Sequence, residues 1–269
     1  MTMTDYRMRI AFSGKSYAGW QRQPGLNTVQ QCVEETLRSV FQEKELTVTA
    51  SGRTDAGVHA LDLPLSFRTA KNLPGQELTR LLKLRLPHDI RLLEIVPSPG
   101  FNAHADALGK AYVYLISPDE PNLFLRDLCW NWPGVTVTDE LRLAVSRLIG
   151  THDFRFFTGK KAGGSTIRTI YRAELVSFGP LLCFYVSGNG FLYKMVRRLA
   201  GFLYETAAGK HTANDLTRHL ENPGPPPDDF TVAPPEGLYL KRVFYRPGEW
   251  CEDQLTAPPF LLPDPRPET

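Results

Sequence analysis

The segment YRMRIAF, residues 6–12, begins the pattern that decides the fold. Apolar and polar residues alternate in it with the period of a strand that buries one face. Downstream, Thr28 and Gln31 have the spacing of a capping box, and an apolar stripe of helical period runs on to Phe41. Further strands are expected at 47–50, 65–68 and 91–96, with a helix at 76–84. The first part of the chain is therefore predicted to fold as β-α-β-β-α-β.

The second part repeats nearly the same order. A helix begins after Thr138, a good N-cap residue, and is expected to stop at Gly150. The other predicted elements are a strand at 111–116, a hairpin of 167–177 with 181–187, helices at 139–149, 191–208 and 212–220, and a strand at 238–245. Two such units indicate an α+β protein of two ferredoxin-like, split-βαβ halves, with a largely antiparallel sheet flanked by helices.

This pattern also suggests where the domains divide. We expect a first half at 1–104, a second half at 105–248 and a proline-rich tail at 249–269. Chain ends with this composition either wrap the surface or fray.

The composition is that of an ordinary soluble protein. Of 269 residues, 42% are hydrophobic and 22% charged, which is enough for a sizeable core. The net charge is only +2, so binding a polyanion would require cations gathered on one face. Scattered cysteines and histidines indicate no metal site, no disulfide framework and a reducing cytoplasm. No apolar run is long enough to span a membrane.

A loop between two predicted strands, SGRTDAGVHA at 51–60, carries the most chemistry. Its two glycines allow a tight backbone path, and Arg53 places a cation close to the carboxylate of Asp55. On these residues alone, the commoner arrangement is a surface turn with an ion pair of small value. The functional alternative is a carboxylate that is held ionised and oriented by its arginine.

The segment GRTDAGVH, residues 52–59, closely resembles the signature of the tRNA pseudouridine synthase A family. Seven further segments resemble other blocks of that family, in the expected order. They are GWQRQ at 19–23, LPHDI at 86–90, FNAH at 101–104 with Ala107, Lys110 and Tyr112, HDF at 152–154, and the stretches 166–170, 190–197 and 233–240. The resemblance extends over residues 6–245, nearly the whole chain.

The resemblance implies an isomerase that needs no cofactor and no metal. It would detach uracil from the ribose at N1, turn it and rejoin it through C5. The family's catalytic aspartate corresponds to Asp55, which either attacks C1′ or removes the 2′ proton, and the sequence leaves both routes open. Either route requires an ionised carboxylate in a dry pocket, a form that a neighbouring cation favours.

The resemblance also implies roles for four supporting residues. Arg53 would pair with Asp55 in the empty site and then help to hold the flipped nucleotide. Tyr112 would stack on the uracil and take part in proton transfer, Arg197 would be the basic partner of Asp55, and Leu238 would pack near the target base. Without the resemblance, Tyr112 would be read as a core aromatic, Arg197 as an arginine at the edge of an apolar helix stripe, and Leu238 as an ordinary strand residue.

Several cations are candidates for contact with RNA phosphates, although each taken alone is more often a solvated charge. They are Lys160, Lys161 and Arg168 around the loop 162–165, Lys194, Arg197 and Arg198 on one helix, and Arg7 and Arg9 on the first strand. The resemblance implies a tRNA substrate read largely by its shape, with uridines 38–40 of the anticodon stem-loop as targets. It also implies a homodimer in which each tRNA touches both subunits.

The chain departs from the family pattern at three places. Ser13 replaces an acid, His104 replaces an arginine, and Leu63-Pro64 interrupts the strand after the loop. Since proline cannot donate to a strand ladder, we expect that strand to begin late or to lie at an edge.

Two other functions fit parts of the sequence. A catalytically idle RNA-binding or chaperone module on the same fold would not need Asp55. A hydrolase of glycosidic bonds would need a second carboxylate, for which Asp62 is the only nearby candidate, and Asp62 is expected on the outer face of a strand.

Overall fold

The structure is a computed structural model that describes residues 3–118, 123–159 and 164–255. It divides into two compact units. The first unit contains the described residues up to Ala107, together with Leu240–Tyr245. The second contains Leu108–Tyr239 and the described residues from Arg246 onward. Among the described residues, no helix has the length and apolar character to cross a membrane.

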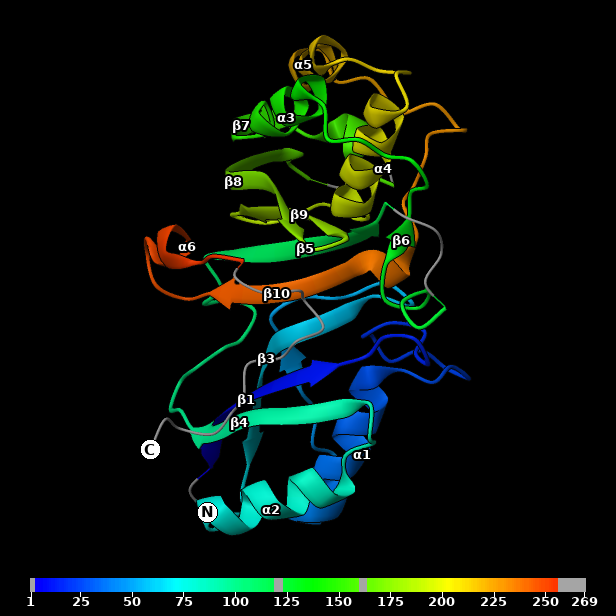
Figure 1. The fold of residues 1–269 in the computed structure, drawn as a ribbon. Helices are drawn as coiled ribbons and strands as arrows, with labels where there is room; N and C mark the ends of the chain where they lie inside the picture. The colour runs from blue at the N-terminus through cyan, green and yellow to red at the C-terminus, as the bar shows by residue number, and fades with distance from the viewer. Residues whose placement is uncertain (1–2, 119–122, 160–163, 256–269) are drawn as a thin grey trace. The chain divides into compact units, whose positions relative to one another are not determined.

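The first unit is a split-βαβ fold. Its strands follow the order β4-β1-β3, with β2 paired to β3, and every pair is antiparallel. Helices α1 and α2 pack together beside this sheet (Figure 1). The elements are β1 (Thr4–Phe12), α1 (Val29–Phe41), β2 (Thr49–Ala50), β3 (His59–Thr69), α2 (Gly75–Arg85) and β4 (Ile90–Pro97). The predicted order of elements is confirmed.

An aromatic cluster joins α1 to the sheet of the first unit. The ring of Tyr6 on β1 stacks on Phe67 of β3, with 5.2 Å between ring centroids. Phe41, the last residue of α1, lies 5.9 Å from Tyr6 and 5.7 Å from Phe67. All three side chains are buried, so the end of the helix is fixed over the sheet by contacts that contribute beyond the area they bury.

The start of α1 forms half of the expected capping box. The side chain of Thr28 accepts a hydrogen bond from the backbone N–H of Gln31. The side chain of Gln31 donates to Glu35 one turn further on. A complete box is formed instead in the second unit, by Thr212 and Asp215 at the start of α5 (Ala213–Glu221).

The expectation for Pro64 was wrong. Strand β3 begins at His59 and runs through Pro64, and it pairs with β1 on both sides of an irregularity between Ala60 and Leu63. The backbone N–H of Ser51 donates to the carbonyl of Pro64, at 3.0 Å. In an extended strand the N–H and C=O of one residue point to the same side, so the missing donor faces the side of β2. The ladder with β2 ends at Leu65, so no β2 residue pairs with Pro64. Because the Pro64 nitrogen faces away from β1, the proline removes no hydrogen bond from the ladder with β1 either.

The second unit is also a mainly antiparallel sheet with helices. Its strands follow the order β5-β9-β8-β7, and β6 pairs in parallel with β5. The strands are β5 (Gly109–Ser117), β6 (Trp130–Asn131), β7 (Gly150–Asp153), β8 (Ile167–Phe178) and β9 (Leu181–Gly188). The helices are α3 (Asp139–Ser146), α4 (Met195–Ala207), α5 and the 3-10 turns η1 (Arg155–Phe157) and η2 (Pro235–Gly237). The α+β class and the antiparallel hairpin of β8 and β9 are confirmed.

Two helix boundaries differ from the prediction. Helix α3 ends at Ser146, and Gly150, with φ +117°, already begins β7. Helix α4 begins at Met195, four residues later than expected, because Lys194 has φ +59°. A left-handed residue cannot continue into a right-handed helix, so residues 191–194 form a turn that leads into α4.

The last described residues pack on the second unit. Strand β10 (Leu238–Phe244) begins in the second unit and ends in the first, and α6 (Glu249–Glu252) follows it. Trp250 stacks on Tyr171 at 4.2 Å, and the hydroxyl of Tyr185 donates to the buried carboxylate of Asp253 at 2.7 Å. These contacts tie the start of the proline-rich tail to β8 and β9.

Candidate active site

The loop that carries Asp55 is a tight turn with a defined backbone path. The N–H of Val58 donates to the carbonyl of Asp55 at 3.2 Å, and Gly57 between them has φ +79°. Two bonds attach the loop to the segment after β1. Trp20 N–H donates to Thr54 O at 3.1 Å, and Gly57 N–H donates to Tyr17 O at 3.3 Å. The carboxylate of Asp55 therefore projects from backbone that is held on both sides.

Two glycines allow the segment after β1 to lie against this loop. A Cβ on Gly14 would stand 2.1 Å from the carbonyl oxygen of Val58. A Cβ on Gly19, which has φ +95°, would stand 2.6 Å from the carbonyl oxygen of Thr54. Both distances are far below a van der Waals contact, and each is to backbone that cannot swing away. Only glycine permits this close approach.

Buried polar groups fix the same region. The hydroxyl of Tyr17 donates to Asp89 at 2.6 Å, and burial together with this carboxylate raises the pKa of Tyr17. The N–H of Gly14 donates to Nδ1 of His59 at 3.1 Å, and the His59 side chain is only 2% exposed. Because Nδ1 accepts, the neutral ring carries its proton on Nε2.

Three segments that resemble family blocks thus meet in the first unit. Gly19 belongs to GWQRQ, Asp89 to LPHDI, and Asp55 with His59 to GRTDAGVH. Sequence reasoning named these segments but missed Gly14 and Tyr17 as supports of the loop. The segment SGKSYAG, residues 13–19, was the signal that pointed to close packing there, because five of its seven residues are small.

Arg53 does not pair with Asp55. Asp55 is half-buried, whereas Arg53 is exposed. Among the described residues, Arg53 forms no ion pair, so the pairing expected in the empty site was wrong. Its neighbour Thr54, by contrast, is buried. The guanidinium is therefore directed to solvent.

In the second unit, Tyr112 lies near one end of β5. Its ring meets the ring of Phe191 edge to face, with centroids 5.0 Å apart and planes at 81°. Tyr112 is 9% exposed. Phe191 follows Gly188-Asn189-Gly190 and belongs to the turn that precedes α4. An aromatic ring held in this way offers a face or an edge on which a base can stack.

Arg197 on α4 is bound to the segment that leads to Leu238. Its Nε donates to the carbonyl of Ala233 at 2.7 Å, and the N–H of Ala233 donates to the carbonyl of Arg197 at 3.1 Å. One residue on, the carbonyl of Pro234 accepts from the hydroxyl of Tyr114 at 2.7 Å. Leu238 itself is buried, at 6% exposure. The segment 233–238 therefore positions both Arg197 and Leu238, and it is attached to β5 through Tyr114.

The candidate RNA-binding cations have different surroundings. Lys160 and Lys161 lie outside the described residues. Arg168 donates to the carbonyls of Ser165 and Ile167 at 2.9 and 2.7 Å. Lys194 lies over the ring of Tyr193 and Arg198 over that of Phe230, each at 5.3 Å. Burial lowers the pKa of Arg198.

Arg7 and Arg9 are less suited to RNA than their sequence positions implied. Arg7 forms an ion pair with Glu94 at 2.9 Å, and Arg9 forms one with Asp62 at 2.5 Å. Their charges are thereby largely compensated within the first unit. The same contact engages Asp62, the only nearby carboxylate considered for a hydrolase. That carboxylate serves a structural pair across two strands.

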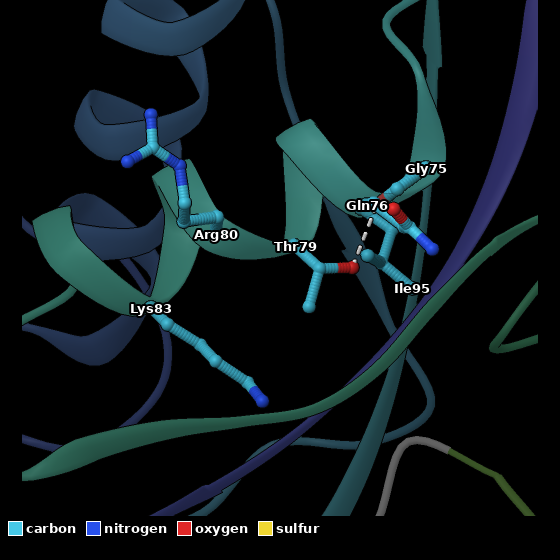
Figure 2. A pocket seen from close by; sticks show the side chains of 6 residues that line it. All are labelled: Gly75, Gln76, Thr79, Arg80, Lys83 and Ile95. Carbon is cyan, nitrogen blue, oxygen red and sulfur yellow. Dashed lines mark hydrogen bonds between the residues drawn. The ribbon is translucent and has the colours of Figure 1, made fainter.

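A shallow pocket on the first unit has a different lining. It is formed by Gly75, Gln76, Thr79, Arg80, Lys83 and Ile95, between α2 and β4. Its two cations, Arg80 and Lys83, extend in different directions, and the hydroxyl of Thr79 is bonded to the carbonyl of Gly75 at 2.8 Å (Figure 2). None of these residues belongs to the segments that resemble the family. Among the described residues, no group of three His, Cys, Asp or Glu side chains is arranged to hold a metal ion.

Comparison with known proteins agrees with the motifs. A family model described as tRNA pseudouridine synthase matches residues 8–106 and 144–246. The tRNA pseudouridine synthase A of Geobacillus sp. (strain WCH70) is 36% identical over 241 residues, covering 88% of this chain and 96% of the relative. The enzyme of that name from Akkermansia muciniphila is 39% identical over 259 residues, which cover 90% of this chain and 96% of the relative.

More distant is a solved structure, the crystal structure of a Cbf5-Nop10-Gar1 complex. The match between the two covers 88% of this chain and 48% of the chain in that structure, with 13% sequence identity and a TM-score of 0.39. The sequence relatives, by contrast, are matched over nearly their whole length.

The matched segments, which extend over most of the chain, are those of an RNA-modifying isomerase. The chain belongs to the tRNA pseudouridine synthase family. This confirms the family and the enzyme class that the resemblance of its segments predicted.

Proposed function

We propose that this protein isomerises uridine to pseudouridine at positions 38–40 in the anticodon stem-loop of tRNA, with Asp55 as the catalytic carboxylate. The observation that carries the proposal is the turn at Asp55. It is built by three segments that resemble family blocks, and two of its supporting glycines admit no side chain. So rigid a setting is not needed for a surface turn, but it suits a group that must be aimed at one atom.

The reaction can be written with its atoms balanced. The bond from C1′ to N1 of uracil breaks, the base turns, and a bond forms from C1′ to C5. The hydrogen on C5 leaves as a proton, and N1 gains a proton. Asp55 would either attack C1′ and later leave it, or remove and return the 2′ proton. Both routes use the ionised carboxylate and restore it at the end.

The supporting residues take the roles that the family resemblance assigns. Tyr112, with its ring held by Phe191, would stack on the uracil, and its hydroxyl would take part in proton transfer. Arg197 would be the basic partner of Asp55, and Leu238 would pack near the base. Arg53, exposed and without an ion pair among the described residues, is available to hold the flipped nucleotide. We further propose that the enzyme acts in the cytoplasm as a homodimer.

Release of tritium from tRNA carrying 5-tritiated uridine tests the reaction. Wild-type protein should release tritium, and mapping of the product should place pseudouridine at positions 38–40. Asp55→Asn should lower the rate by more than about 10³-fold while binding tRNA as well as wild type. Asp62→Asn is a matched control, since it removes a carboxylate that pairs with Arg9, and it should keep most of the activity.

The outcomes separate the alternatives. Activity that survives in Asp55→Asn would show that Asp55 is not catalytic. Binding without tritium release by folded wild-type protein would favour the idle RNA-binding module. Product at other uridines would leave the chemistry intact and reject the anticodon stem-loop as the target.

A further inference from the structure

At one end of the sheet of the second unit, three neighbouring strands bring two cations together. Lys110 on β5 is the pairing partner of Gly188 on β9, which in turn pairs with Ile170 on β8. Arg168 lies two residues before Ile170 and close enough to Lys110 for their charges to interact. Lys110 was recognised in the sequence only as part of a family segment and received no role.

The backbone around this pair is closely packed. Asn189 exchanges two hydrogen bonds with the backbone of Thr169, through its own N–H and through its side-chain oxygen, each at 3.0 Å. A Cβ on Gly188 would lie 2.6 Å from the carbonyl of Thr169, and one on Gly190 would lie 3.7 Å from Nε of Arg168. The turn 188–190 is thus fixed against β8, and it lies beside the side chain of Arg168.

Neither cation has an anionic partner in the part of the chain that the structure describes. Among the described residues, the guanidinium of Arg168 donates only to the backbone carbonyls of Ser165 and Ile167. Lys110 is half-buried, and its side chain forms no hydrogen bond or ion pair with any described residue. Burial, and after it the charge of Arg168, lowers the pKa of Lys110, and burial also lowers that of Arg168. Two like charges in a half-buried place are unfavourable unless an anion joins them.

Other cations of the chain are arranged differently. Arg7 and Arg9 have carboxylates opposite them, and Arg80 and Lys83 are exposed and diverge (Figure 2). A cation that only covers a surface has no reason to be half-buried beside another. The pair of Lys110 and Arg168 therefore resembles a site that binds an anionic group of another molecule.

Its place on β5 indicates the source of the anion. Residues two apart on a strand point to the same face, so Lys110 lies beside Tyr112 on the face that Phe191 also touches. We propose that Lys110 and Arg168 together bind a phosphodiester group of the RNA next to the nucleotide that stacks on Tyr112. This inference rests on the proposed function, because it takes Tyr112 as the base-binding residue.

The salt dependence of tRNA binding gives the first test. Lys110→Met and Arg168→Met are compared in an Asp55→Asn background, so that bound RNA is not converted. Each should weaken the affinity for tRNA at least about tenfold. The double variant should reduce the slope of log K against log salt by about 0.7 to 0.9, the value of one phosphate contact, and each single variant should reduce it by part of that amount. The matched control, Lys83→Met, removes an exposed charge from the shallow pocket and should change neither quantity.

Neutral linkages in the RNA give the second test. Synthetic stem-loops carry one methylphosphonate at a time on either side of the target uridine, which removes a single phosphate charge. At one linkage, wild type should lose affinity about as much as Lys110→Met does with unmodified RNA. At that linkage, Lys110→Met should lose nothing further.

The outcomes distinguish this inference from the proposed function. If both variants bind the whole series of neutral linkages with the same losses as wild type, Lys110 and Arg168 contact no phosphate there. That result overturns the inference, whether or not the enzyme makes pseudouridine. If Asp55→Asn remains active or wild type releases no tritium, the proposed reaction fails, while the phosphate contact stands or falls on the binding data alone. Lys110→Arg, which keeps the charge, should recover part of the affinity.

Discussion

The two units position their candidate functional residues by different means. In the first, backbone rests on backbone: Gly14 and Gly19 lie against the Asp55 loop, and main-chain hydrogen bonds close it. In the second, long side chains such as Arg168 and Arg197 hold to carbonyl groups of the main chain, and Tyr112 is held by an aromatic contact. The comparison teaches that the carboxylate proposed as catalytic is placed rigidly, whereas the groups proposed to meet RNA keep side chains that can adjust.

The largest effect is expected where backbone meets backbone. Gly14→Ala should lower the free energy of unfolding by about 3 kcal/mol, because the new Cβ would stand 2.1 Å from the carbonyl oxygen of Val58. Gly14 has no positive φ, so the whole effect is steric. Urea unfolding followed by tryptophan fluorescence measures it.

Gly25→Ala is the matched control for this prediction. Gly25 has φ +75°, but a methyl group added there would have nothing within 4 Å, so only the backbone preference is lost, about 1 kcal/mol. Equal losses in the two variants would show that the close approach at Gly14 is not what holds the loop.

The next prediction concerns the ring of Tyr112 in the second unit. Tyr112→Leu should lower kcat/KM roughly ten- to hundredfold, because stacking of a base on an aromatic ring contributes about 1–3 kcal/mol. Tyr112→Phe keeps the ring and its contact with Phe191, so RNA binding should be kept. A fall in kcat alone for Tyr112→Phe would assign the hydroxyl to proton transfer. Equal activities of the Leu variant and wild type would remove Tyr112 from the site.

A smaller effect is expected from pH. The pKa of Lys110 is lowered from 10.5, so its charge is lost at a lower pH than that of an ordinary lysine. Because the charged form is the one proposed to bind phosphate, tRNA affinity should fall severalfold as pH rises from about 7 to about 9.5. Arg168, the charged group facing Lys110, stays protonated over this range, because a guanidinium loses its proton only at much higher pH. Lys110→Arg should show a flatter profile, and identical profiles would contradict the assignment.

The same lowered pKa has a consequence for stability with the opposite sign. The charged form of Lys110 is less favourable in the folded than in the unfolded chain, so it destabilises the fold at neutral pH and ceases to do so as pH rises. Lys110→Met should therefore raise the free energy of unfolding while it weakens tRNA binding. If Lys110 were kept only for packing, Lys110→Met would lower the free energy of unfolding and leave tRNA binding unchanged.

The sequence predicted those features of the molecule that repeat locally. The alternation in residues 6–12 and the stripe from Val29 to Phe41 identified β1 and α1, since each side chain there reports the period of its own element. Strands β6 and β7, of two and four residues, are too short to show a period. The early end of α3 left no local signal either.

Features that depend on distant parts of the chain were harder to predict. Whether Pro64 interrupts a ladder depends on which side of β3 its nitrogen faces, and that is set by the pairing with β1 and β2. Adjacent positions suggested that Arg53 pairs with Asp55, yet the turn directs the arginine to solvent. The role of Gly14 as a support of the loop at Val58 arises from packing between segments 44 positions apart.

The last effect should come from single hydroxyl groups of the second unit. Tyr114→Phe removes the bond to the carbonyl of Pro234, at 2.7 Å, and should lower the free energy of unfolding by about 1–2 kcal/mol. Tyr239→Phe removes a similar bond to the carbonyl of Leu128, at 2.6 Å, and should cost about the same. The two differ in what the bond holds, because Ala233, next to Pro234, is bound to Arg197. Only Tyr114→Phe should therefore raise KM for tRNA. If both variants raise KM equally, the segment from Ala233 to Leu238 does not position Arg197, and side-chain anchoring in the second unit is general stability rather than placement of the site.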